Sequence, residues 1–184
     1  MKDNEIWLGY KSLNQDMYFD VPDERKEWLL ANKKEGSAYK IIDGVVMGRL
    51  ASACWFTNLD HGKRHELLLL DTMAHNLKFN KRLCKKFERD FGVIEYPHYD
   101  NYDAIEVPFT ECIPSDYDGV MGVPITFMDK FNPEQFEIIG ATESEGKGFS
   151  QGLWNKDSGV AQPMVASNRI YKRIFIRPKR GGAN

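Results

Sequence analysis

Long hydrophobic runs are missing from this chain of 184 residues. No apolar stretch approaches the roughly 20 residues that a membrane-spanning helix needs. The first ten residues, MKDNEIWLGY, contain no long apolar core of the kind that a signal peptide requires. We therefore expect a cytoplasmic protein with no membrane partner.

The chain also has few cysteines and a small net charge. Cys54, Cys84 and Cys112 are odd in number and lie far apart, and their spacing matches no zinc site, so reduced, buried thiols are predicted. The net charge of −2 gives no bulk signal for nucleic acid. Apolar residues make up 42% of the chain and charged residues 28%, which is typical of a soluble globular protein with a sizeable core.

The most informative stretch is Tyr99–Gly140, which mixes apolar runs, turn residues and acidic side chains. A first apolar run ends at Val107, because Pro108 has no N–H to give to a central strand ladder. Turn residues at 115–119 and a possible cap or turn at 132–134 separate the later apolar runs. These runs are Val120–Met128 and Phe136–Gly140, so two or three strands with fixed turns are predicted here.

Further elements are expected on both sides of that stretch. Tyr39–Met47 predicts a hairpin, with Asp43 and Gly44 as a type I′ turn. The other predicted strands are Glu5–Tyr10, Leu50–Leu59 and Arg169–Pro178, whereas Leu67–Leu70 fits either a strand or a helix. Lys11–Gly36 is interpreted as a polar connection with one turn of helix.

Asp71–Asp90 predicts a helix, since Met73, Leu77, Leu83 and Phe87 recur at spacings near three or four. The remaining positions of this segment are rich in cations: Lys78, Lys81, Arg82, Lys85, Lys86 and Arg89. A solvated helix face explains them best, and a face that contacts phosphates is the alternative.

Strand Arg169–Pro178 alternates two kinds of side chain. One face is mainly apolar and is expected to lie in the core: Ile170, Lys172, Ile174 and Ile176. The other face interleaves Arg173 and Arg177 with Tyr171 and Phe175, which suits phosphate contact and base stacking. An exposed edge strand protected from aggregation by charge explains the pattern equally well.

Three segments carry a resemblance to the EcoRI-type DNA adenine methyltransferase family. Residues 99–140 resemble its C-terminal half, Cys54–Gly62 (CWFTNLDHG) a second signature, and Ile6–Tyr10 (IWLGY) a third, in the family's order. The resemblance implies a mixed, strand-rich α/β fold with closing strands of a Rossmann-like methyltransferase sheet and a C-terminal DNA-recognition region. It divides the chain into a closing portion, residues 1–71, and a target-recognition region, residues 72–184.

The family transfers a methyl group from S-adenosylmethionine to the amino group of a flipped adenine. Its catalytic N/D-P-P-Y/F tetrapeptide is absent here, because Asn132-Pro133-Glu134 lacks the second proline and the aromatic residue. No Gly-rich cofactor turn follows an early strand either. We therefore expect a truncated, split or internally started C-terminal part of a bacterial or phage-encoded enzyme, with no catalytic residue, no bound cofactor and no activity of its own.

DNA contact is the role that the resemblance implies for the loop after the second signature. Its candidates are Asn58, His61, Lys63 and Arg64, where the two cations suit phosphates and an arginine also suits a guanine edge. Arg173 and Arg177 are added from the strand pattern alone. A solvated polar turn is the alternative for the loop.

Other functions stay open at this point. Asp60, His61, His65 and Glu66 have the side-chain types of a metal-dependent nuclease, but no second motif with ligand spacing accompanies them. A non-catalytic DNA-binding or subunit module, assembled with a separately encoded catalytic half, is another alternative. An exposed apolar sheet edge near Ile6–Tyr10 would favour it. A nonfunctional remnant is the last.

Overall fold

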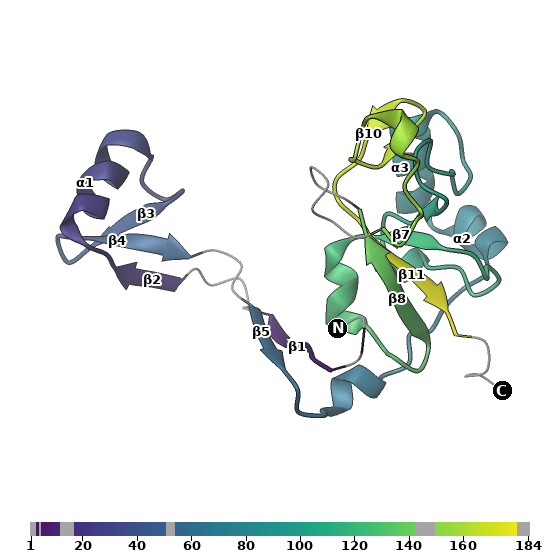
Figure 1. Cartoon of the computed structure of the whole chain (residues 1–184), viewed down its shortest axis with the longest axis horizontal. Helices are drawn as coiled ribbons and strands as arrows, with labels where there is room; N and C mark the ends of the chain where they lie inside the picture. Colours follow the sequence, from purple (N-terminus) through teal and green to yellow (C-terminus); the bar gives the residue numbers. More distant parts are fainter. Residues whose placement is uncertain (1–2, 4, 12–16, 51–53, 143–149, 180–184) are drawn as a thin grey trace. The chain divides into compact units, whose positions relative to one another are not determined.

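The computed structural model describes residues 3, 5–11, 17–50, 54–142 and 150–179. The chain forms two compact units (Figure 1). The smaller unit is Trp7–Thr57, and the larger unit comprises Met1–Ile6 and Asn58–Asn184. Several sheets and helices alternate along the sequence, which confirms the predicted mixed α/β class. The contacts group the chain differently from the functional division at residue 71, which stays a prediction.

The smaller unit contains five strands and one helix among its described residues. These elements are β1 (Trp7–Lys11), β2 (Met17–Asp20), α1 (Asp23–Asn32), β3 (Tyr39–Ile42), β4 (Val45–Leu50) and β5 (Cys54–Thr57). β1 and β5 form an antiparallel pair, and a second sheet has the order β2-β4-β3. The predicted hairpin is confirmed, since Asp43 and Gly44 both have positive φ, at 49° and 80°.

Two predictions for the smaller unit need correction. The interpretation of residues 11–36 as a connection is wrong, because it missed β2 and the ten-residue helix α1. Acidic residues Asp23 and Glu24 follow Pro22 in the first turn, where they suit the helix dipole. Leu29 is the one residue of this helix that is buried, so the sequence contains no apolar stripe that would predict the helix. The strand predicted from residue 50 begins at Cys54, and Leu50 ends β4.

The larger unit is built on a four-stranded sheet with the order β6-β7-β11-β8. Its strands are β6 (Ile105–Glu106), β7 (Met121–Val123), β8 (Phe136–Ala141) and β11 (Ile174–Pro178). β6 and β7 are parallel, and β11 is antiparallel to both of its neighbours. A short hairpin of β9 (Met164–Val165) and β10 (Asn168–Arg169) precedes β11.

Along the sequence, α-helices and 3₁₀-helices precede, separate and follow the strands of this sheet. They are η1 (Gly62–His65), α2 (Met73–Phe79), α3 (Lys81–Phe91), η2 (Thr110–Cys112), η3 (Ile125–Lys130) and η4 (Lys156–Ser158). The predicted helix at 71–90 is thus confirmed but divided at Asn80, whose side chain accepts a hydrogen bond from Leu83 N and caps α3. No strand or helix forms at Leu67–Leu70, and none of the described helices is long and apolar enough to span a membrane.

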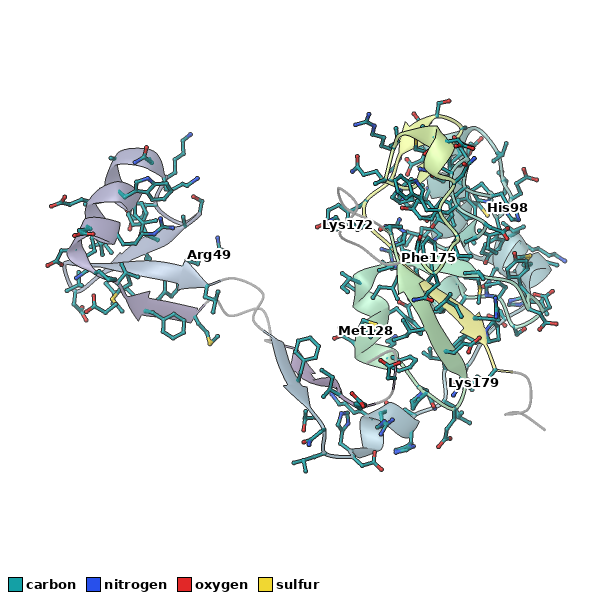
Figure 2. The ribbon with its side chains drawn as sticks, in the orientation of Figure 1. Arg49, His98, Met128, Lys172, Phe175 and Lys179 are labelled. Atoms are coloured by element: carbon teal, nitrogen blue, oxygen red, sulfur yellow. The ribbon has the colours of Figure 1, made fainter. Side chains whose placement is uncertain are left out.

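The core of the larger unit is aromatic. Phe175 on β11, labelled in Figure 2, is fully buried. It packs against Tyr99 and Tyr102, with ring centroids 6.2 Å and 5.0 Å away. Ile176 beside it is also fully buried, so both faces of this inner strand are covered. The predicted separation of one core face from one exposed face along residues 169–178 is therefore wrong. Cys84 and Cys112 are free thiols, the first half-buried and the second buried.

Candidate nucleic-acid interface

The loop that follows β5 belongs to the larger unit and is fastened to the turn that opens β8. His65 Nδ1 lies 3.1 Å from a carboxylate oxygen of Glu134. Leu68 exchanges two hydrogen bonds with the side chain of Gln135, at 2.7 Å and 3.0 Å. Asn132, fully buried, donates to the carbonyl of Glu66 and accepts from Glu134 N, which confirms the turn predicted at 132–134. The loop is therefore held by contacts that span almost 70 residues.

His65 lies between two carboxylates. Its Nε2 is 2.8 Å from Asp60 Oδ1, opposite the contact with Glu134. The hydrogen bond with Asp60, followed by that with Glu134, raises the pKa of His65, and the hydrogen bond with His65 lowers the pKa of Asp60. At mildly acidic pH a protonated imidazole of His65 thus links Asp60 in the loop to Glu134 in the turn that opens β8.

The four loop candidates divide into two pairs. Asn58 and Lys63 are exposed, whereas His61 and Arg64 are half-buried. The side chain of Arg64 is 13% exposed, and its Nη1 lies 3.4 Å from Asp60 Oδ1. The loop therefore presents the amide of Asn58 and the ammonium group of Lys63 to solvent, whereas most of the Arg64 side chain is buried.

Arg177 lies near the same end of β8. It pairs in register with Glu137, and the two side chains form a half-exposed ion pair at 3.4 Å. Glu137 is three residues along the chain from Glu134, which holds His65. The fold thus brings Arg177 and the loop to neighbouring positions at the start of β8, although 112 residues or more separate them in sequence.

Arg173 is placed in the interior instead. Its Nη2 and Nε donate to Glu106 at 2.6 Å and 2.9 Å, and Glu106 is fully buried. Tyr99 donates to the same carboxylate at 2.5 Å. Burial opposes the charge on Arg173, but the hydrogen bonds with Glu106 outweigh it and raise the pKa of Arg173. This pairing argues against the predicted DNA contact by Arg173, because its guanidinium donors are already engaged.

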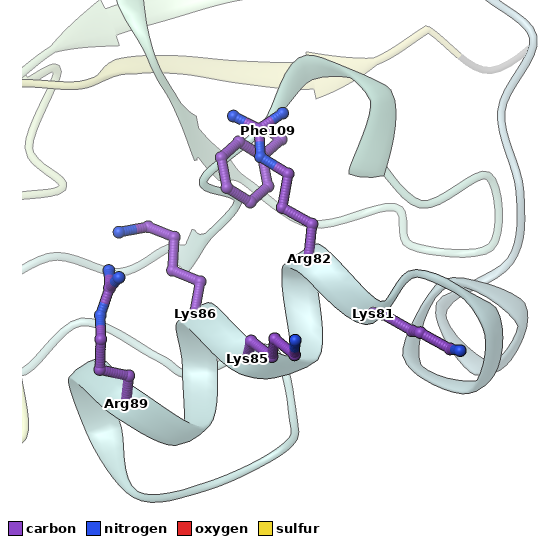
Figure 3. A pocket seen from close by; sticks show the side chains of 6 residues that line it. All are labelled: Lys81, Arg82, Lys85, Lys86, Arg89 and Phe109. Atoms are coloured by element: carbon purple, nitrogen blue, oxygen red, sulfur yellow. The ribbon is translucent and has the colours of Figure 1, made fainter.

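Helix α3 carries a basic surface. A hollow of about 580 Å³ is lined by Lys81, Arg82, Lys85, Lys86 and Arg89 of this helix, together with Phe109 (Figure 3). The guanidinium carbon of Arg82 lies 3.8 Å from the centroid of the Phe109 ring. The cations at residues 81, 85 and 89 were the available signal, since residues four apart share a helix face.

The chemistry of the basic hollow on α3 does not fit the methyl donor of the family. S-adenosylmethionine carries a sulfonium cation, and the 580 Å³ hollow is lined by five cations that would repel it. A second hollow of about 430 Å³ shares Lys81 and lies along α2. In the parts of the chain that the structure describes, no three His, Cys, Asp or Glu side chains are placed to hold a metal ion, so the geometry gives no support to the nuclease alternative.

Comparisons with known proteins cover nearly the whole chain. The family model for the adenine-specific methyltransferase EcoRI matches residues 1–179. The chain is similar to type II methyltransferase M.EcoRI of Escherichia coli, with 36% identity over 181 residues, which are 98% of this chain and 45% of that protein.

Two mycoplasma proteins are also similar. A type II methyltransferase of Mycoplasma genitalium is 36% identical, and M.MpnI of Mycoplasma pneumoniae is 34% identical, each over 138 residues. These alignments cover 75% of this chain and 37% of either relative. The chain thus spans less than half the length of the relatives it matches, and no solved structure matches it.

Proposed function

Because the chain belongs to the EcoRI family of adenine-specific methyltransferases, we propose that it supplies DNA binding and target recognition for methylation of an adenine amino group in double-stranded DNA. The observation that carries this proposal is the fastened loop after β5, which presents Asn58 and Lys63 to solvent near Arg177. Such a surface combines phosphate-binding cations with a group that reads base edges.

The candidate residues fall into three groups in this proposal. Lys63 and Arg177 contact phosphates and contribute affinity without reading sequence. Asn58 suits an adenine edge, since an amide can pair with N6 and N7 in the major groove. His61 and Arg64 are half-buried, and their accessible atoms add to the same contact surface.

The methyl transfer itself is proposed for an assembled enzyme and not for this chain alone. S-adenosylmethionine supplies the methyl group there, and the five cations of the 580 Å³ hollow would repel its sulfonium group. Residues 1–71 then close a Rossmann-like catalytic sheet, residues 72–184 recognise the target, and a separately encoded catalytic half is the partner we infer. The system is a bacterial or phage-encoded restriction–modification system in the cytoplasm.

A salt series tests the proposal. The purified chain is titrated with a 30-base-pair duplex between 50 and 200 mM salt, with and without S-adenosylmethionine. We expect binding that weakens with salt, is unaffected by the cofactor and produces no methylated DNA. Lys63→Gln and Arg177→Gln should each reduce the slope of log K against log salt by about 0.9. Lys130→Gln is the matched control, because Lys130 is exposed on η3.

Two results would contradict the proposal. Wild-type protein that binds no duplex at low salt removes the DNA-binding role altogether. Binding that requires S-adenosylmethionine, or methylated product from this chain alone, places a donor site within it and overturns the division of labour.

A further inference from the structure

The basic face of α3 is charged well beyond what its own acids neutralise. Five cations line one hollow, and two acids pair with three of them. Asp90 accepts from Lys86 and Arg89, each at 2.6 Å, and Glu111 lies 3.0 Å from Arg82. Among the described residues, no acid lies within ion-pair distance of Lys81 or Lys85, and both lysines are exposed. The face therefore keeps two ammonium groups for an external anion.

The cations are held in a row and not scattered. Residues 81, 85 and 89 follow one another at four-residue spacing, so they extend over about 12 Å of helix axis. Successive phosphates of one DNA strand advance by about 3.4 Å along the duplex axis, so neighbouring cations of the row, about 6 Å apart, match roughly every second phosphate. Figure 3 shows Arg82, Lys86 and Arg89 extending to the same side of α3, towards Phe109.

The helix is rigid enough to present that row. Leu83 and Phe87 on its opposite face are fully buried, and the αL residue Gly92 ends it. Asp90, whose pKa is lowered to about 2 by the hydrogen bond with Arg89 and by Lys86, stays ionised and fixes these two side chains. Stacking on Phe109 fixes Arg82 in the same way. Fixed cations lose less conformational entropy on binding than mobile ones do.

The surface continues beyond the helix. A neighbouring hollow of about 400 Å³ shares Lys86 and is lined as well by Arg169 and Tyr171, both of them exposed, and by the ion-paired carboxylates of Asp90 and Glu106. A guanidinium and an aromatic ring at the far end of the row extend the same chemistry. An apolar partner would gain little here, because the aromatic area is small and the cations would lose their hydration.

From this charge, spacing and rigidity we propose that α3 binds the sugar–phosphate backbone of duplex DNA, with Lys81, Lys85 and Arg89 on phosphates of one strand. This inference rests on the proposed function, and it adds a second contact surface at α3, apart from the loop at the start of β8. The contact is independent of sequence, since no side chain of the row needs to reach a base edge.

Paired variants of the whole chain test the α3 contact. Lys81→Gln/Lys85→Gln is compared with Lys34→Gln/Lys130→Gln, which removes the same charge from exposed positions outside both proposed contact surfaces. Glutamine has nearly the helix propensity of lysine, so folding should be preserved, and circular dichroism checks it. The probes are two 30-base-pair duplexes of unrelated sequence.

We expect the α3 variant to lower the salt slope by about 1.8 and the affinity at 0.1 M salt by about 60-fold, equally on both duplexes. The control variant should retain the wild-type slope. Equal slopes for wild type and the α3 variant, an equal loss in the control, or a loss on one duplex only would each overturn the inference. A wild-type chain that binds neither duplex would overturn the proposed function as well, so the two failures are distinguishable.

Discussion

Glu106 and Arg173 form an ion pair that is closed off from solvent and joins β6 to the residue before β11. Two hydrogen bonds connect the carboxylate to the guanidinium, and the hydroxyl of Tyr99 completes the coordination of Glu106. Arg173 also donates from Nη1 to the carbonyls of Tyr171 and Lys172. The pair therefore fixes the approach of the chain to its inner strand.

Breaking this pair should be costly. We expect Arg173→Met or Glu106→Gln to reduce the free energy of unfolding by about 3–5 kcal/mol, because each leaves a buried partner uncompensated. The double variant should lose less than the sum of the two, as measured by urea denaturation in a double-mutant cycle. Additive losses would show that the two groups do not interact.

Gly122 on β7 should tolerate no side chain. A Cβ added there would lie 2.1 Å from the hydroxyl oxygen of Tyr99, which is itself fixed by Glu106. Gly122→Ala should therefore lower the free energy of unfolding by about 1–3 kcal/mol. Gly62→Ala is the matched control, since open space surrounds that position, and its thermal midpoint should stay close to wild type. Similar midpoints for the two variants would contradict the packing described.

The cluster of His65, Asp60 and Glu134 should make stability depend on pH. The pKa of His65 is raised above its ordinary value of about 6.5, so its contribution is complete below that pH and is lost as pH rises through the folded-state pKa. The pKa of Asp60 is lowered from about 3.8, so its contribution exists above that pH and is lost on further acidification.

His65→Gln should accordingly lower the thermal midpoint most between about pH 4 and 6.5 and progressively less towards pH 9. His98→Gln serves as the control, because His98 is an exposed histidine of the same unit. A difference from wild type that stays constant from pH 5 to 9 would refute the role of the protonated imidazole.

Asn80 should matter as the cap of α3. Its carbonyl oxygen accepts from Leu83 N at 3.0 Å, and its amide donates to Cys112 Sγ at 3.1 Å. Asn80→Ala should reduce the free energy of unfolding by about 1–2 kcal/mol, and Asn80→Ser should recover most of that loss because serine also caps helices. Chemical denaturation of the three proteins measures this; equal stability of the alanine and serine variants would count against capping.

Features determined by neighbouring residues were predictable from the sequence. Asp43-Gly44 demands positive φ and therefore marks its hairpin, and the apolar spacing of residues 71–90 marks a helical segment. Helix α1 was missed because its burial depends on Leu29 alone. The division at Asn80 was missed because a capping asparagine looks like any polar residue until its partner is known.

The candidate site was predictable only in part, for a similar reason. The loop at 58–65 was predicted as a DNA contact from the family resemblance, but its fastening to Glu134 and Gln135 depends on contacts across almost 70 residues. Arg173 was misjudged because alternation suggests one exposed face, whereas β11 is an inner strand with both faces covered. The periodicity of a cation row such as that on α3 does not say whether the row faces solvent or binds an anion.

The pairing of Trp7 with Thr57 across β1 and β5 has an evolutionary consequence. The chain enters and leaves the smaller unit at a single point, so this unit is one uninterrupted stretch of about 50 codons whose two ends are neighbours. Recombination can exchange such a stretch without rethreading the rest of the polypeptide. One crossover on either side of this stretch would replace the coding segment of the whole unit in a single exchange.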